Sequence, residues 1–139
     1  MDAHDMEADL RERVARSSFH SWMGMGLITA SPGRVEIALD AAEHHLNLQG
    51  LLHGGIVATL ADTATGLAVR SMVPPGTRHV TVQLDVHYLL PGTSGRITAV
   101  GTTLRVGNSI ASAEAEISDE RRRLLAKATA TVAVMAGRP

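Results

Sequence analysis

The 139-residue chain contains no cysteine, which excludes disulfide bonds, a thiolate nucleophile and cysteine-ligated zinc. Phe, Trp and Tyr together make up 2% of the residues, so few rings are present for stacking on nucleic-acid bases. The formal net charge of -1 also argues against binding to a phosphate backbone. We therefore expect no nucleic-acid partner, and a core built from Val, Leu, Ile, Ala and Met.

Long apolar runs are missing as well. No segment approaches the roughly 18 apolar residues that a membrane-spanning helix needs. The polar start MDAHDMEADLRERVARSS lacks the apolar region of a signal peptide. Together with the absence of cysteine, these features predict a cytoplasmic protein without a membrane partner. With 45% hydrophobic residues, the chain is large enough for one domain with its own core.

Motifs for a metal or a cofactor are not found either. Seven histidines are present, but His44, His45 and His53 match no standard ligand spacing, and HExxH does not occur. The Gly-Met-Gly segment 24–26 lacks the third glycine of a dinucleotide-binding loop, and no serine lies in a GxSxG motif. We expect neither metal nor cofactor. A carboxylate is left as the candidate group for acting on water or on an acyl carbon.

Two segments have the spacing of helices. Residues 5–18 mix acidic and basic side chains around an apolar stripe of Met6, Leu10 and Val14, which predicts a short docking helix. The apolar segment of residues 53–72 is too long for a typical strand and stops at a Pro-Pro-Gly sequence. We expect this second segment to form a long helix.

Six further segments alternate in the manner of half-buried strands. They are residues 24–30, 34–40, 79–88, 96–106, 110–118 and 124–135. Two strands, one apolar helix and four more strands predict an α+β architecture, in which a curled antiparallel sheet wraps around one long central helix. Strict alternation in the third segment puts its valines, Leu84 and Tyr88 on one face and Thr81 on the other.

The long helix contains one charged residue in an apolar setting. Asp62 is the only Asp, Glu, Lys or Arg between Glu43 and Arg70, and an ionised carboxylate there is costly unless it is paired or used. At about 100° per residue, Asp62 lies opposite the arc that should face the sheet. The residues beside it are small and would let a second backbone or a slender ligand approach. They are Ala58, Thr59, Thr63 and Gly66.

The start of the same helix has the chemistry of an oxyanion hole. Gly54 and Gly55 have no Cβ to obstruct approach to unpaired backbone N–H groups, and a helix N-terminus favours negative charge. Eight residues at about 1.5 Å each separate Gly54 from Asp62 by about 12 Å. A reacting carbonyl needs both groups within about 3 Å or one water. Antiparallel helices from two copies would bring them together, so a catalytic Asp62 predicts a homodimer.

These residues belong to a longer pattern. It reads Asn47-x-x-Gly50-x-x-His53-Gly54-Gly55, then Leu60-x-Asp62, and later Tyr88-x-x-Pro91-Gly92. The pattern resembles that of the hotdog-fold acyl-CoA thioesterases, most closely the branch named for phenylacetate degradation and 4-hydroxybenzoyl-CoA hydrolysis. The resemblance covers residues 19–135. We therefore divide the chain into an N-terminal helical extension, residues 1–18, and a hotdog thioesterase domain, residues 19–139.

The resemblance implies a coenzyme A thioester substrate that is held at a subunit interface and hydrolysed to the free acid and coenzyme A. Asp62 falls on the family's acidic residue, and Gly54 falls on the backbone amide that polarises the carbonyl. Asn47 matches the amide that places the carbonyl or the attacking water. Thr81 falls where the family often has a hydroxyl near the water. Because the family commonly pairs its dimers, a homodimer or a dimer of dimers is implied.

The residues leave several alternatives open. His53 is either a general base or an orienting group for the loop, and Asn47 either acts on the substrate or braces that loop. Gly55 and Thr63 are expected beside the substrate. The alternative functions are a non-catalytic acyl-CoA-binding protein and an enoyl-CoA hydratase. A binder has no need of a costly carboxylate, and the hydratase normally uses an Asp/His pair near a helix start. The acyl group, and whether Asp62 acts as base or nucleophile, cannot be read from the chain.

Overall fold

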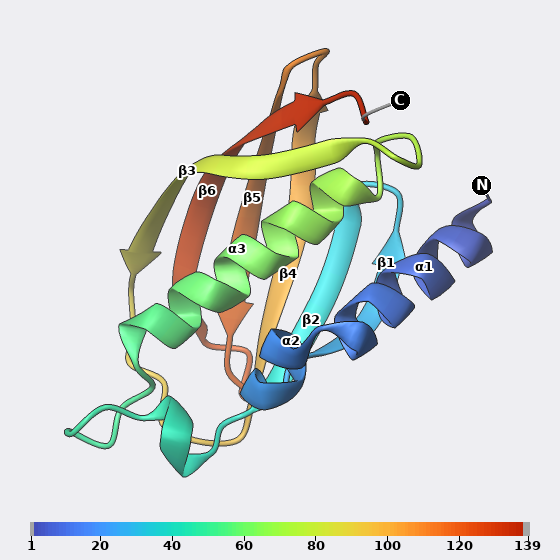
Figure 1. Cartoon of the computed structure of the whole chain (residues 1–139). Coiled ribbons are helices and arrows are strands. Elements are labelled where there is room, and N and C mark those ends of the chain that lie inside the picture. Colours follow the sequence, from blue (N-terminus) through green and yellow to red (C-terminus); the bar gives the residue numbers. More distant parts are fainter. Residues whose placement is uncertain (1, 138–139) are drawn as a thin grey trace.

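The computed structural model describes residues 2–137 and shows one long helix, α3 (Gly54–Arg70), in the curve of an antiparallel sheet (Figure 1). The strands are β1 (Gly26–Ser31), β2 (Arg34–Asp40), β3 (Arg78–Tyr88), β4 (Arg96–Val106), β5 (Ile110–Ser118) and β6 (Leu124–Met135). Ahead of them lie α1 (Ala3–Arg16) and α2 (Ser18–Met23), and a short 3-10 turn, η1 (Glu43–His45), follows β2. The predicted α+β architecture, a curled sheet around one long central helix, is confirmed.

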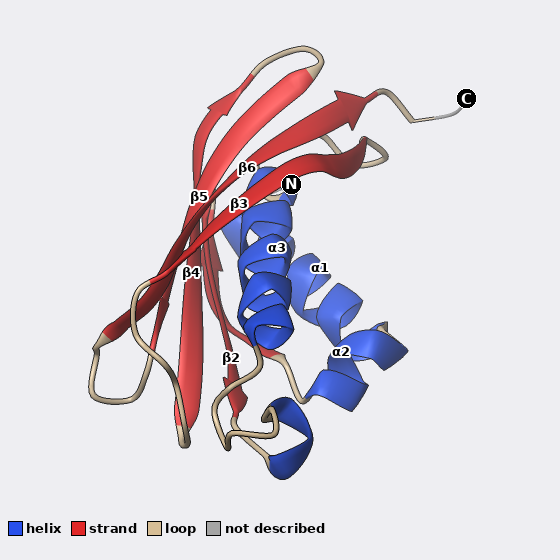
Figure 2. Cartoon of the chain, turned by 90° about the vertical axis from the view of Figure 1, so that its left-hand side faces the viewer, coloured by secondary structure: helices blue, strands red, loops and turns tan. Residues whose placement is uncertain are grey.

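The sheet has two edge strands, one at each end of its strand order. Its strand order is β1-β2-β4-β5-β6-β3, with all neighbours antiparallel, so β1 and β3 are the edge strands. The three helices lie on the same side of the sheet, and α1 and α2 lie beyond α3 as seen from the strands (Figure 2). Within residues 2–137, no helix is both long enough and apolar enough to cross a membrane.

Helix α3 packs closely on β4 at a pair of small residues, Ala64 and Gly101. Most of the arc predicted to face the sheet is buried, with Leu60, Ala61, Ala64 and Ala68 all at 0% exposure, whereas Ile56 and Leu67 are half-buried. Opposite them, β4 carries Gly101, where an added Cβ would overlap the backbone carbonyl of Ala64. The helix therefore approaches β4 more closely than any side chain at position 101 would allow.

The alternation predicted for β3 is wrong in its first half. The pairing of β3 with β6 shifts register between Thr81 and Gln83, so Val82 is an extra residue in a β-bulge. One extra residue in a strand moves every side chain before it to the opposite face of the sheet. Leu84 packs against the core as expected, but Val80 and Val82 are 50% and 59% exposed. Thr81 takes the inward side instead, opposite the buried Val132.

Helix α1 lies along the edge strand β1 through its apolar stripe. Met6, Leu10 and Val14 are buried, as the sequence predicts. The sequence predicts a helix that runs as far as residue 18, whereas α1 ends at Arg16. Ser17 then accepts a hydrogen bond from the His20 N–H at 3.2 Å and starts α2, which the sequence did not reveal.

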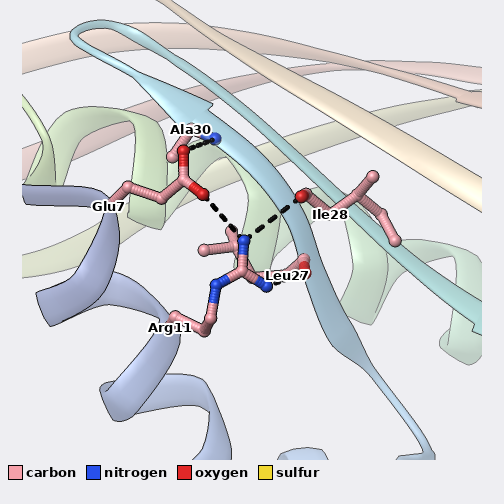
Figure 3. Close-up of polar contacts among 5 residues, drawn as sticks. All are labelled: Glu7, Arg11, Leu27, Ile28 and Ala30. Carbon is pink, nitrogen blue, oxygen red and sulfur yellow. Dashed lines mark hydrogen bonds and ion pairs between the residues drawn. The ribbon is translucent and has the colours of Figure 1, made fainter. Parts of the chain in front are cut away.

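A polar clamp holds the same helix to the backbone of β1 (Figure 3). Arg11 donates to the carbonyl oxygens of Leu27 and Ile28 at 2.7 and 3.3 Å and pairs with Glu7 at 2.8 Å. The Glu7 carboxylate also accepts a 3.4 Å hydrogen bond from the Ala30 N–H. The bond from Arg11 lowers the pKa of Glu7. Helix α1 thus covers the edge at β1.

Candidate active site

His53 caps α3 with its side chain. Its Nδ1 accepts a 2.8 Å hydrogen bond from the Gly55 N–H, and its backbone carbonyl accepts from the Ile56 N–H at 2.9 Å. A ring nitrogen that accepts a hydrogen bond carries no proton, so the ring proton of neutral His53 is on Nε2. In this geometry His53 orients the helix start, which is one of the two roles expected for it.

The two glycine amides at the helix start therefore differ. The Gly55 N–H is bound by His53, whereas the Gly54 N–H has no hydrogen-bond acceptor among residues 2–137. The Gly54 carbonyl accepts a 2.7 Å bond from the Tyr88 hydroxyl. Tyr88 is a site residue that the sequence reasoning placed in a pattern but gave no function. Of the two amides, the structure leaves that of Gly54 available to a ligand.

Asn47 braces the loop that leads to the helix. Its Oδ1 accepts from the backbone N–H groups of Gln49 at 2.9 Å and Leu51 at 3.1 Å. Both bonds use the carbonyl oxygen of the side chain, so its NH2 group is left for another partner. Asn47 and His53 line one open pocket of about 830 Å³ just before α3. Bracing the loop and contacting a substrate are compatible roles for this side chain.

Asp62 lies farther along α3, on the side that faces away from the sheet. The sequence suggested an apolar setting for this carboxylate, but in the single chain Asp62 is exposed. No ion pair with Asp62 occurs in the described part of the chain. The pocket around it measures about 440 Å³. Its lining residues are His20, Asp62, Thr63, Gly66, Leu67, His79, Val80 and Thr81.

Some of the predicted site residues line this pocket, and others lie outside it. Thr63 and, because of the bulge, Thr81 line it together with Asp62. Asn47 and His53 line the other pocket, and Gly54 is about two turns of helix from Asp62, or roughly 12 Å. One chain therefore holds the carboxylate and the free amide as two separate half-sites.

Two histidines beside Asp62 were not singled out by the sequence. His20 comes from α2 and His79 from β3, and both line the Asp62 pocket. Burial lowers the pKa of each imidazole below its ordinary value of 6.5. For His79, Arg70 and Arg13 lower the pKa further, while Asp62 acts in the opposite direction. Both rings are therefore neutral at neutral pH.

Known proteins are similar to this chain in sequence and in fold. The sequence profile of the thioesterase superfamily matches residues 49–126, from the loop before α3 into β6. The chain belongs to the thioesterase superfamily. The predicted family, and with it thioester hydrolysis as the reaction class, is confirmed. Nothing in this match assigns roles to individual residues.

Two relatives show the extent of the similarity. A putative esterase of Halobacterium salinarum is 37% identical over 121 residues, which cover 84% of this chain and 80% of that protein. The medium/long-chain acyl-CoA thioesterase YigI of Escherichia coli is 38% identical over 102 residues. That match covers 62% of this chain and 64% of YigI, so the chain spans just under two thirds of that relative.

Solved structures agree with the fold. The PaaI protein from the phenylacetic acid degradation operon of E. coli superposes with a TM-score of 0.89 over 97% of this chain and 96% of that chain. At 21% identity, this likeness shows the fold alone. The smu.793 protein of Streptococcus mutans, solved bound to acetyl CoA, has a TM-score of 0.75 at 27% identity and covers 83% of this chain and 91% of its own.

Proposed function

We propose that this thioester hydrolase is an acyl-CoA thioesterase, which converts a coenzyme A thioester to the free acid and coenzyme A at a site shared by two subunits. The observation that carries the proposal is the free Gly54 N–H at the start of α3, on the same helix as the unpaired carboxylate of Asp62. The acyl-CoA activity named for YigI and the acetyl CoA bound to smu.793 support the substrate class.

In this mechanism the Gly54 N–H donates a hydrogen bond to the thioester carbonyl oxygen. Negative charge develops on that oxygen when the carbonyl carbon is attacked, so an aimed donor stabilises the transition state. Asp62 removes a proton from water, and the resulting hydroxide attacks the carbon. The C–S bond then breaks, and the coenzyme A thiolate takes up a proton. Direct attack by the Asp62 carboxylate, followed by hydrolysis of the anhydride, is the alternative route to the same products.

The separation of the two half-sites supports assembly of two chains. With two α3 helices antiparallel, Asp62 of one subunit would lie beside Gly54 of the other, which gives two equivalent sites. Strand β3 offers a surface for this contact, because it is an edge strand with exposed Val80 and Val82. We propose a homodimer, and pairing of dimers into a tetramer.

The remaining site residues have supporting roles in this proposal. Asn47 directs its free NH2 group to the carbonyl or the water while its oxygen braces the loop. Thr81, which lines the Asp62 pocket, places the water through its hydroxyl. His53 orients Gly55 at the helix start, and Gly55 and Thr63 contact the substrate.

We also propose a cellular location and a division into domains. The absence of cysteine supports a cytoplasmic location. For the chain as a whole, we propose that residues 1–18 are an extension to the domain of residues 19–139. Helix α1 supports this division, because it lies on the outside of β1 and is held there by Arg11.

A thiol-release assay on a panel of acyl-CoA esters tests the function. The wild type should turn over at least one ester, and Asp62→Asn should lower kcat by about 10²–10⁴. Asp85→Asn is a matched control, because Asp85 is an exposed carboxylate farther along β3. Near-normal kcat per folded Asp62→Asn dimer would remove Asp62 from the mechanism. Tight acyl-CoA binding without turnover of any ester would identify a binding protein instead.

A further inference from the structure

The outer edge of β1 is bonded to side chains of α1, and that of β3 is not. An edge strand presents unpaired N–H and C=O groups, which form a template for another strand. Within residues 2–137, no side chain makes a hydrogen bond to the backbone of β3. On β1, three backbone groups of the outer edge have partners on α1 (Figure 3). The two sheet edges therefore differ in how far they are open to a second chain.

Glu7 and Arg11 supply the hydrogen bonds that a neighbouring strand would supply. Arg11 donates to the carbonyl oxygens of Leu27 and Ile28 at 2.7 and 3.3 Å. Glu7 accepts from the Ala30 N–H at 3.4 Å. The hydrogen bond from Arg11, and after it the one from the Ala30 N–H, lowers the pKa of Glu7, so this side chain is ionised at neutral pH and only accepts. Donors thus meet carbonyls and an acceptor meets an amide, as in an antiparallel ladder.

A β-bulge in β1 explains why one side chain reaches two carbonyls. The pairing of β1 with β2 shifts register between Leu27 and Thr29, so Ile28 is an extra residue. In a regular strand successive carbonyls point to opposite edges. Here those of Leu27 and Ile28 lie on the same side, and the planar fork of donors on Arg11 reaches both. Without Arg11, both acceptors would be left for water or for the N–H groups of another strand.

The two clamping side chains lie next to the apolar stripe of α1. Leu10, which precedes Arg11, is 1% exposed, so the helix is packed against the domain at this point. Glu7 and Arg11 also pair with each other at 2.8 Å. A second pair of the same helix, Asp9 and Arg13, has the same spacing and the same length of 2.8 Å but makes no hydrogen bond to β1. Only the first pair therefore acts on the edge of the sheet.

We propose that α1 closes the β1 edge to a second copy of this chain, so that the sheets of two copies can pair edge to edge only at β3. A sheet with two open edges can add a copy at each, and repeated contacts of this head-to-tail kind give open filaments. With one edge closed, such growth ends at a pair of copies related by a twofold axis. This closure affects assembly and does not depend on the hydrolysis proposed above.

Hydrogen exchange of the Ala30 amide, measured by NMR, tests the clamp. In Glu7→Ala/Arg11→Ala this amide should exchange about 10–100-fold faster, as expected when a hydrogen bond to a charged group is lost. The matched control is Asp9→Ala/Arg13→Ala, which should leave the exchange unchanged. The two side chains of the control pair are 51% and 33% exposed, against 49% and 34% for Arg11 and Glu7. Unchanged exchange at Ala30 in the first variant would overturn the proposal.

Light scattering tests the closure itself, in variants whose α1 is also less firmly packed. Adding Leu10→Ala to both double variants removes the same buried side chain from each, so a general loss of folding would appear in both. The triple variant without Glu7 and Arg11 should at least double its mean mass relative to the wild type, because whole assemblies can then pair through β1. The triple variant without Asp9 and Arg13 should keep the wild-type mass.

A charge on β1 shows whether the added association uses this edge. Ile28 is 42% exposed, and Ile28→Lys in the first triple variant should restore the wild-type mass, because a charged edge opposes strand pairing. Growth that persists with Ile28→Lys would overturn the proposal. Growth in both triple variants would overturn it as well, as would a constant mass in the variant whose Ala30 amide exchanges fast.

Discussion

The Tyr88 hydroxyl donates a 2.7 Å hydrogen bond to the carbonyl oxygen of Gly54, and so joins the last residue of β3 to the first residue of α3. The same phenol ring limits the space at the helix start, because a Cβ on Gly54 would lie 3.3 Å from the Tyr88 oxygen. Tyr88 thus restrains the residue whose N–H group is proposed to polarise the thioester carbonyl.

Tyr88→Phe should reduce turnover more than stability. The change removes one hydrogen bond, worth roughly 1 kcal/mol, from the support of the helix start. If all of that energy is used to aim the Gly54 N–H, kcat falls by about fivefold. The ring is 56% exposed, so the melting temperature should hardly change. Both quantities should be measured on one preparation, and an unaltered kcat would show that Tyr88 does not support the amide.

Gly54→Ala should be more harmful than Tyr88→Phe. The new Cβ would be tight against the Tyr88 ring and would also obstruct the thioester at the amide. Loss of one oxyanion donor typically costs about 10²–10³ in kcat. Gly26→Ala is the control, since a Cβ at Gly26 meets nothing within 4 Å. A folded Gly54→Ala protein with normal turnover would refute the oxyanion assignment.

Activity should require at least a dimer. Light scattering is expected to show a dimer or tetramer at assay concentrations, and kcat per chain should fall on dilution below the dissociation constant. Val82→Lys places a charge on the open edge at β3 and should weaken both assembly and turnover. Leu104→Lys is the comparison, because Leu104 is 57% exposed and Val82 is 59% exposed. An active monomer would contradict the shared site.

Gly101→Ala should destabilise the fold. The added Cβ would overlap the Ala64 carbonyl, and backbone atoms in a packed helix cannot give way as a flexible side chain does. Overpacking of this kind typically costs about 1–3 kcal/mol of unfolding free energy. Urea denaturation measures the loss, with Gly26→Ala again as control. Equal stability of the two variants would show that α3 can move away from β4 at little cost.

Stability should decrease as the pH falls below about 6.5. His20 and His79 have pKa values lowered by burial from 6.5, so the unfolded chain binds protons before the folded chain does. Stability then falls with pH, until the folded state is protonated as well. His79→Gln should flatten this decrease and His87→Gln should not, as measured by urea denaturation across this pH range. If stability falls with pH at the same rate in both variants, this prediction is wrong.

Much of the fold follows from local patterns. The stripe of Met6, Leu10 and Val14 predicted a docking helix, and the arc of α3 around Leu60 and Ala64 is buried as expected. The six strands were also predicted, because alternation repeats over several residues in each. These features depend on neighbours within about one turn of helix or one strand, which the sequence displays directly.

The candidate site was predicted less completely. The roles of Asp62, Gly54 and Asn47 are still predictions, while the structure adds Tyr88 and His79, which had no assigned function. The expected apolar setting of Asp62 was wrong for the single chain, since helical periodicity shows that Asp62 lies opposite the buried arc but not what covers that side. Whether that side of α3 is covered depends on elements distant in sequence or on a second copy of the chain.

Local sequence patterns were enough to locate the helices α1 and α3, the six strands and the start of α3, because periodicity and the His53 cap act between residues close in the chain. Only the tertiary structure decided which face Thr81 occupies, because one extra residue in β3 reverses the alternation and no local pattern marks it. It also decided that Tyr88 reaches Gly54, a contact between residues 34 positions apart. Such contacts follow from the register of strands across the whole sheet, which is set by the packing of all of them around α3.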